Sequence, residues 1–215
     1  MATLDELRNL HPEETIWVIG SGPSLNFIEP DFFDDKICVT VNLVGRTYGL
    51  KSFYAYSNYH SIPPKRIFGN GLKVAVMLAK DTLTQNPWPG NVPDNVALSE
   101  AHSYNPPGSA WDPYTMPPPE GQIVYGSSSI HGATHLAAHL GAKNIILVGA
   151  DCGFIDETIN VQGYPHATEH YSLRVWNKHT QILKRWLAEK YGVRIHSLNP
   201  FINLNLEGHT FRGVS

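Results

Sequence analysis

The sequence predicts a three-layer α/β fold built on a mostly parallel sheet. Short apolar runs rich in β-branched residues alternate with segments of helical periodicity, which is typical of strands covered by helices. The first apolar run, at 16–19, leads directly into the glycine-rich turn 20–24. The 215 residues, with 42% hydrophobic content, suit a single domain, 1–215.

The turn after the first strand is the first candidate binding element. Its glycines, Gly20 and Gly22, allow the backbone to approach a ligand closely, and Pro23 suits the first turn of a helix. The hydroxyls of Ser21 and Ser24 can cap that helix or contact an anion. We therefore expect a phosphate site here, at a helix N-terminus. A standard NAD fingerprint is disfavoured because position 25 is Leu, and no Gly-Lys-Ser/Thr of an ATPase loop follows.

The remaining elements are predicted from periodicity and breakers. The sequence predicts an amphipathic helix within 1–15, with Leu4, Leu7 and Leu10 on one face, and a short helix or turn at 25–33. Longer helices are expected at 127–141 and 169–191, and further strands at 37–41, 53–56, 72–78, 144–148 and 193–198. The tail from 199 is expected to pack loosely.

Parallel strands end at a common edge of the sheet, where ligands bind. We therefore expect Ser21, Asn42, Ser57 and Asn58 to gather at that edge, because each follows or closes a predicted strand. Asp151 stands just past the strand at 144–148 and is a candidate active-site acid.

Residues 81–121 differ in character from the rest of the chain. Prolines recur through this segment, and tryptophans and tyrosines lie between them. Long loops of this kind in compact domains are usually functional. The sequence predicts an irregular inserted loop that acts as a lid over the edge of the sheet.

The predicted helix at 127–141 begins with Ser127, Ser128 and Ser129, and three histidines follow at every fourth position. His131, His135 and His139 therefore lie on one helical face. That spacing suits a metal, but the Glu that follows the first His in zincins is absent. We interpret the three histidines as a solvated polar face, and we assign no metal site.

The net charge, the N-terminal sequence and the cysteines limit which partners and which cellular compartment we expect. The net charge of −3 gives no electrostatic footprint for nucleic acid and no polybasic membrane patch. The N-terminus lacks a signal peptide pattern, and no run is long enough for a membrane span, so a cytoplasmic location is expected. Cys38 and Cys152 are expected to be buried free thiols.

Four pieces of the chain together resemble a known superfamily. They are I-G-S-G-P-S-L at 19–25, Asn42, S-S-S-I-H-G-A-T-H-L-A-A-H-L-G-A-K-N-I-I-L-V-G-A-D at 127–151, and Y-G-V-R-I-H-S-L-N-P at 191–200. They resemble the Rossmann-like superfamily that joins the family-42 bacterial sialyltransferases and the archaeal 6-hydroxymethylpterin diphosphokinase (MptE-like) domain. The resemblance covers about half of the chain and leaves the proline-rich segment unmatched.

The resemblance to the sialyltransferases implies a donor site for a CMP-sugar. Positions that match donor contacts are Ser21, which replaces the usual Asn, together with Asn42 and the serines 127–129. Asp151 matches the family's Asp, but the aromatic pair expected after it is replaced by Cys152-Gly153-Phe154. Tyr164 or Tyr171 could take over the tyrosine's contact to the departing phosphate.

The resemblance also places the catalytic base, a histidine, shortly before the last helix. His166 and His170 both lie near that place, and we select His170. Independently of the family, a glycosyl transfer without metal needs a general base for the acceptor hydroxyl, and His is suited to that near neutral pH.

The sequence therefore favours a nucleotide-dependent transferase, a glycosyltransferase with a nucleotide-sugar donor, preferably a CMP-sugar, and no required cofactor. One alternative is a diphosphokinase of the pterin type, in which Mg²⁺ would be held by Asp151 with Asp156 or Glu157. Another is a nucleotide-binding protein without catalytic activity. The identity of the acceptor is left open.

Overall fold

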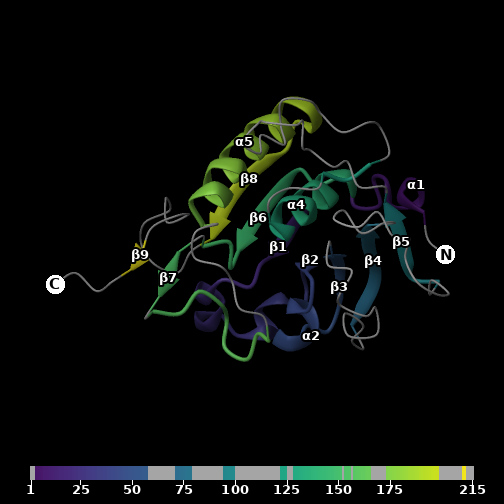
Figure 1. Cartoon of the computed structure of the whole chain (residues 1–215). Coiled ribbons are helices and arrows are strands. Elements are labelled where there is room, and N and C mark those ends of the chain that lie inside the picture. The colour runs from purple at the N-terminus through teal and green to yellow at the C-terminus, as the bar shows by residue number, and fades with distance from the viewer. Residues whose placement is uncertain are drawn as a thin grey trace.

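The computed structural model describes residues 3–57, 71–78, 94–99, 122–124, 128–151, 153–155, 157–165, 173–198 and 210–211. Within these ranges, seven strands form one sheet in the order β5-β4-β3-β2-β1-β6-β8 (Figure 1). Every neighbouring pair is parallel. The predicted α/β class with a largely parallel sheet is confirmed.

The strands of this sheet coincide closely with the apolar runs of the sequence. They are β1 (Thr15–Ile19), β2 (Ile37–Val41), β3 (Phe53–Ser57), β4 (Leu72–Leu78), β5 (Val96–Ser99), β6 (Asn144–Val148) and β8 (Arg194–Leu198). The six predicted strands are therefore present, with ends that shift by at most about one residue, as is usual for strand boundaries.

Strand β5 corrects one expectation. It falls inside the segment 81–121, which was predicted to be irregular, and it pairs in parallel with β4 at the edge of the sheet. The apolar Val96 and Ala97 are fully buried there, so a short core strand is hidden among the prolines. Apart from 94–99, the predicted lid lies outside the described residues.

Helices flank the sheet (Figure 1). They are α1 (Leu4–Leu7), α2 (Val44–Tyr48), α4 (Ser129–His139) and α5 (Leu173–Tyr191), with the 3₁₀ helices η1 (Pro23–Phe27) and η2 (Pro30–Phe33). Helix α1 buries Leu4 and Leu7, whereas Leu10, predicted on the same face, is 48% exposed because α1 ends at Leu7.

Helix α4 is the central helix of the molecule. It lies over β1, β2, β3 and β6 and also contacts α5, and all of its residues are buried. Gly132 makes this close approach possible, since a Cβ on it would stand 2.1 Å from the ring of Tyr56 in β3. The predicted glycine after the helix, Gly141, has φ of +98° and ends it.

Strand β1 lies in the middle of the sheet and pairs with both β2 and β6. Strands β1 to β5 follow one another in one direction, and β6 starts the other half of the sheet. The order of the strands therefore reverses between β1 and β6, which is where open parallel sheets bind their ligands.

The C-terminal part adds a second, small sheet, in which β7 (Phe154–Ile155) pairs with β9 (Thr210–Phe211). The described part of the tail is thus anchored by strand pairing, where loose packing was expected.

Cys38 is a buried free thiol, as predicted, and burial raises its pKa to about 12. Cys152 lies outside the described residues. None of the described helices has the length and apolarity needed to cross a membrane.

Candidate functional site

The site is the edge of the sheet at which β1, β2, β3 and β6 end. The turn 20–24 follows β1, Asn42 follows β2, Ser57 closes β3 and Asp151 follows β6. Helix α4 begins beside them, because Asn42 donates a hydrogen bond to Ser129. The predicted gathering of Ser21, Asn42 and Ser57 at one edge agrees with these positions, and Asn58 lies outside the described residues.

The glycines of the turn allow the loops after β1 and β6 to touch. Gly20 donates to the carbonyl oxygen of Val148, and Gly22 donates to that of Gly149, both at 2.7 Å. A Cβ on Gly20 would stand 2.4 Å from the oxygen of Gly149, and a Cβ on Gly22 would stand 2.6 Å from it. The small residues are thus required by contact between two protein loops, which the sequence alone could not distinguish from contact with a ligand.

Asp151 is part of this contact. The carboxylate is almost fully buried, and its Oδ2 accepts a hydrogen bond of 2.7 Å from the backbone N–H of Ser24. The turn continues into η1, a 3₁₀ helix of five residues, which agrees with the short helix or turn expected in this region. At this helix start, a carboxylate of the protein itself already occupies an N–H group that the sequence suggested for an external anion.

The serines of the turn differ in their surroundings. Ser21 is half-buried, and its hydroxyl donates to Oδ1 of Asn160 at 3.2 Å. Ser24 is fully buried, and its Oγ is the single buried side-chain polar atom without a hydrogen-bond partner among the described residues. A buried hydroxyl without a partner is costly, so this atom is available to an added ligand or water.

Tyr164 belongs to the loop that covers the turn. Val161 in the same loop donates its N–H to the carbonyl oxygen of Ser21 at 2.6 Å, and Tyr164 in turn donates its N–H to Val161. The Tyr164 side chain is half-buried against the core. The predicted tyrosine therefore lies in the loop that contacts the turn after β1.

Asn42 connects three elements. Its side chain accepts from Ser57 Oγ at 2.9 Å and donates to Ser129 Oγ at 3.1 Å. Its backbone has φ of +46°, a left-handed conformation that Asn tolerates better than most residues. The residue thus closes β2, holds the end of β3 and fixes the start of α4.

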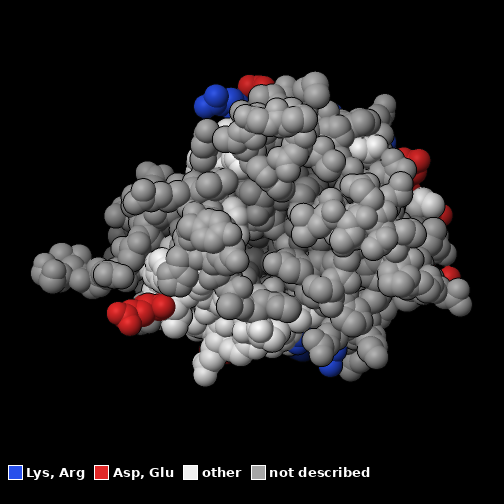
Figure 2. Space-filling view, viewed as in Figure 1, with Lys and Arg blue, Asp and Glu red and all other residues white. Residues whose placement is uncertain are grey.

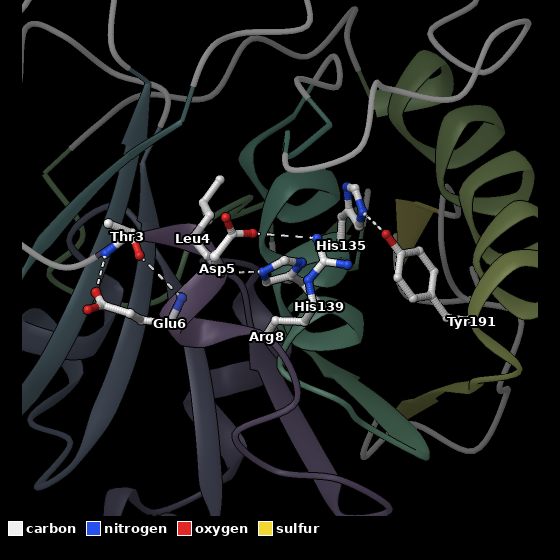
Figure 3. Close-up of polar contacts among 8 residues, drawn as sticks. All are labelled: Thr3, Leu4, Asp5, Glu6, Arg8, His135, His139 and Tyr191. Carbon is white, nitrogen blue, oxygen red and sulfur yellow. Dashed lines mark hydrogen bonds and ion pairs between the residues drawn. The ribbon is translucent and has the colours of Figure 1, made fainter.

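The histidines of α4 correct an expectation. His131, His135 and His139 were interpreted as a solvated polar face, but they are buried, with 0%, 1% and 7% exposure. His131 and His135 both contact α5, whereas His139 contacts α1. Nε2 of His139 lies 2.6 Å from the carbonyl oxygen of Leu4, and Nε2 of His135 lies 2.8 Å from the hydroxyl of Tyr191. Figure 3 draws both contacts.

Hydrogen bonds determine the protonation state of these rings. His135 Nδ1 accepts from the N–H of Val124 at 2.9 Å, and His131 Nδ1 accepts from that of Ser128 at 3.3 Å. A backbone N–H can only donate, so both rings are neutral and protonated at Nε2. Burial accordingly lowers the pKa of both His131 and His135 to about 3. This face of α4 is polar because groups in the segments packed against it need hydrogen-bond partners inside the protein. Helical spacing alone does not show whether such a face is buried or exposed to solvent.

Several of the candidate residues lie outside the described part of the chain. His166 and His170, the predicted bases, and Ser127 are not among the described residues. Glu157 is exposed in the loop after β7 and Asp156 is not described. Among the described residues, no cluster of three or more His, Cys, Asp or Glu side chains could hold a metal ion. On the face drawn in Figure 2, described charges of both signs lie around the margin.

The sequence analysis missed Asn160 and Thr180. Both are polar partners of site residues, Asn160 of Ser21 and Thr180 of His131. No local pattern around either residue points to the site, because the contacts join parts of the chain that are far apart in sequence.

The fold of the chain resembles solved structures, although its sequence matches no known family. No protein-family model matches the chain, and no curated protein matches it in sequence. The structure resembles the sialyltransferase CstII from Campylobacter jejuni in complex with the substrate analogue cytidine-5'-monophosphate, with a TM-score of 0.53 and 13% identity. The match covers 92% of this chain and 85% of CstII. At this identity the match establishes a shared fold only.

Two further solved structures match with TM-scores below 0.5. The MAf glycosyltransferase from Magnetospirillum magneticum AMB-1 matches with a TM-score of 0.49 and 13% identity, over 94% of this chain. This chain spans only 36% of that protein. A structure of the sialyltransferase CST-II with a trisaccharide acceptor and CMP matches with a TM-score of 0.45 and 14% identity, covering 91% of this chain and 87% of that one.

Proposed function

We propose that the protein is a glycosyltransferase that uses a nucleotide-sugar donor, preferably a CMP-sugar, and a histidine as general base. The supporting observation is the gathering of Ser21, Asn42 and Asp151 with the start of α4 at the switch point between β1 and β6. This edge belongs to a fold that the chain shares with a sialyltransferase whose structure contains CMP.

The groups at this edge suit a nucleotide phosphate and sugar. Hydroxyls of Ser21, Ser24 and Ser128 and the amide of Asn42 can donate and accept, which polar ligands with ribose and phosphate groups need. The hydroxyl of Ser24 has no partner within the described residues, and it lies in the turn that the resemblance assigns to the donor. The N–H groups of the turn are largely used within the protein, so side chains carry most of the proposed recognition.

The general base is proposed to be His170, with His166 as the other candidate. The buried histidines of α4 are unsuited to this task. Both ring nitrogens of His131 and His135 are occupied, and burial lowers their pKa to about 3. A base near neutral pH needs an accessible ring with a pKa close to the working pH.

The test is a thermal-shift screen with CMP, CDP, UDP, ADP, GDP and ATP, each with Mg²⁺ and with EDTA. A ligand that binds the folded state raises the melting temperature by mass action. We expect CMP to stabilise the protein equally under both conditions, and a CMP-sugar to be hydrolysed or transferred with release of CMP. Stabilisation by ATP that requires Mg²⁺ would instead support the diphosphokinase.

The catalytic step is tested with variants of the candidate bases. His170→Ala is expected to abolish CMP release while CMP still raises the melting temperature. His166→Ala is the matched variant, and loss of activity there alone would move the base to His166. CMP binding without turnover in the wild type would favour the non-catalytic alternative.

A further inference from the structure

His131 contacts two elements at once. It is fully buried one turn into α4, where Nδ1 accepts from the N–H of Ser128 at 3.3 Å. Nε2 lies 3.1 Å from Oγ1 of Thr180 in α5. Since Nδ1 must carry the lone pair, Nε2 carries the proton and donates it to Thr180. Thr180 donates its own proton to the carbonyl oxygen of Trp176 at 2.9 Å.

This link continues into the candidate site. Ser128 precedes the first residue of α4, and the next residue, Ser129, accepts from Asn42 at 3.1 Å. Asn42 in turn accepts from Ser57 at the end of β3. The start of α4 is therefore tied to the sheet by Ser129 and to α5 by His131.

We infer that His131 is a positioning residue that holds Ser128 and Ser129 in place and so sets the affinity for the donor nucleotide. The inference rests on the function proposed above, because that function requires these serines to belong to the donor site. The ring of His131 contacts Thr180 in α5. It therefore affects donor binding by positioning the two serines.

The residue type at this position supports the inference. The third residue of a helix commonly reaches back to the N-terminal N–H with a Glu or Gln side chain. A Glu here would add a negative charge beside a bound phosphate, whereas the buried His131 makes the same contact as a neutral group. Its second nitrogen also reaches α5, which a Ser, Thr or Ala at this position could not do.

The experiment compares His131→Phe with His139→Phe. His139 is the matched control because it is buried on the same face of α4, two turns away, and contacts the backbone of Leu4. Both variants lose a buried ring hydrogen bond, so both are expected to lower the melting temperature. Only His131→Phe is expected to raise the Kd for CMP and the donor KM, by about tenfold, while kcat changes less.

A conservative variant separates positioning from simple packing. In His131→Asn, Oδ1 is attached to Cγ as Nδ1 is in histidine, so it can accept from Ser128 without reaching Thr180. His131→Asn is expected to recover most of the affinity that His131→Phe loses. This variant also keeps the test valid if His131→Phe does not fold. Equal CMP affinity in His131→Phe and His139→Phe would overturn the inference, and so would a loss of CMP affinity of about tenfold or more in a folded His131→Asn.

Amide hydrogen exchange provides a readout that needs no ligand. The amide of Ser128 is expected to exchange faster in His131→Phe than in His139→Phe, because its acceptor is removed. Equal exchange rates overturn the positioning role. A wild-type protein that binds no nucleotide overturns the proposed function and the donor part of the inference, whereas the exchange rates still decide whether His131 orders Ser128.

Discussion

Asp151 Oδ2 accepts a hydrogen bond from the backbone N–H of Ser24 at 2.7 Å, and this contact joins the loops that follow two neighbouring strands. The Asp151 side chain is buried, so this hydrogen bond is shielded from water. It ties the turn after β1 to the end of β6 at the switch point of the sheet.

Asp151→Ala is expected to lower the free energy of unfolding by about 1–3 kcal/mol, because the buried N–H of Ser24 loses its acceptor. Asp151→Asn keeps an acceptor oxygen and is expected to cost less. Urea unfolding measures both, with Asp35→Ala as the control, since the Asp35 side chain is 83% exposed. Equal stability of Asp151→Ala and the control would show that the contact contributes nothing.

Gly22→Ala tests whether the turn needs a small residue for contact between the loops. The added Cβ would stand 2.5 Å from Asp151 Oδ2 and 2.6 Å from the oxygen of Gly149, so the loops must separate. We expect a loss of about 1–3 kcal/mol in unfolding free energy and weaker nucleotide binding. Gly163→Ala is the comparison, since its φ is +79° and its Cβ would meet nothing within 4 Å.

Gly163→Ala should cost only the strain of the left-handed backbone, about 1 kcal/mol, with unchanged CMP affinity. Chemical denaturation and calorimetric CMP titration of both glycine variants measure the two quantities. If the two variants behave alike in CMP binding, the turn after β1 has no special part in the site.

Asn42 combines a backbone requirement with a hydrogen-bond requirement, and two substitutions separate them. Asn42→Gly removes the contacts to Ser57 and Ser129 but accommodates the φ of +46°. Asn42→Ala loses the same contacts and adds left-handed strain, so we expect it to be less stable by about 1 kcal/mol. Thermal unfolding measures this difference.

Both Asn42 variants are expected to lose the same CMP affinity, because both lack the side-chain amide. Unequal affinities that follow the stabilities would mean that Asn42 acts on the fold alone. A double-mutant cycle with Ser129→Ala then measures the coupling between the two side chains.

The buried histidines predict a loss of stability in mild acid. The pKa values of His131 and His135 are about 3 in the folded protein, whereas both titrate near 6.5 in the unfolded chain. Below pH 6.5 the unfolded chain binds protons that the folded protein does not, so stability falls as the pH decreases toward 3. Each histidine contributes about 1.4 kcal/mol per pH unit.

The variant His135→Asn tests how much His135 contributes to this pH dependence of the unfolding free energy. This variant retains an oxygen for the N–H of Val124 but cannot titrate. Its unfolding free energy should therefore fall less steeply than that of the wild type below pH 6.5, and the difference in slope should approach about 1.4 kcal/mol per pH unit near pH 5. Urea unfolding at several pH values measures the slopes. Identical slopes would contradict the neutral, buried state of His135.

The strands were predictable from the sequence because each is a compact apolar run bounded by breakers, as at 37–41 and 144–148. Strand β5 was missed because its four residues lie among prolines, where local composition indicates a loop. Its position is fixed by pairing with β4, and a pairing partner cannot be recognised from the strand alone.

The candidate site was predictable where it depends on topology. Asn42 and Ser57 follow strands, and parallel strands must end together. Their hydrogen bonds, and the contact of Asp151 with Ser24, depend on tertiary distances that no spacing encodes. The histidines of α4 were misread because every fourth position fits a buried face as well as an exposed one. The absence of charged residues from 129–139 was the signal for burial on all sides.

The central place of β1 has a consequence during protein synthesis. Its partner β2 follows within a few tens of residues, but the register pairs Thr15 with Asn144 on the other side. As the chain leaves the ribosome, β1 therefore presents an apolar edge with unpaired amides until β6 has been translated. An N-terminal fragment that ends before residue 144 is expected to bind holding chaperones or to aggregate, and the emergence of β6 should release it.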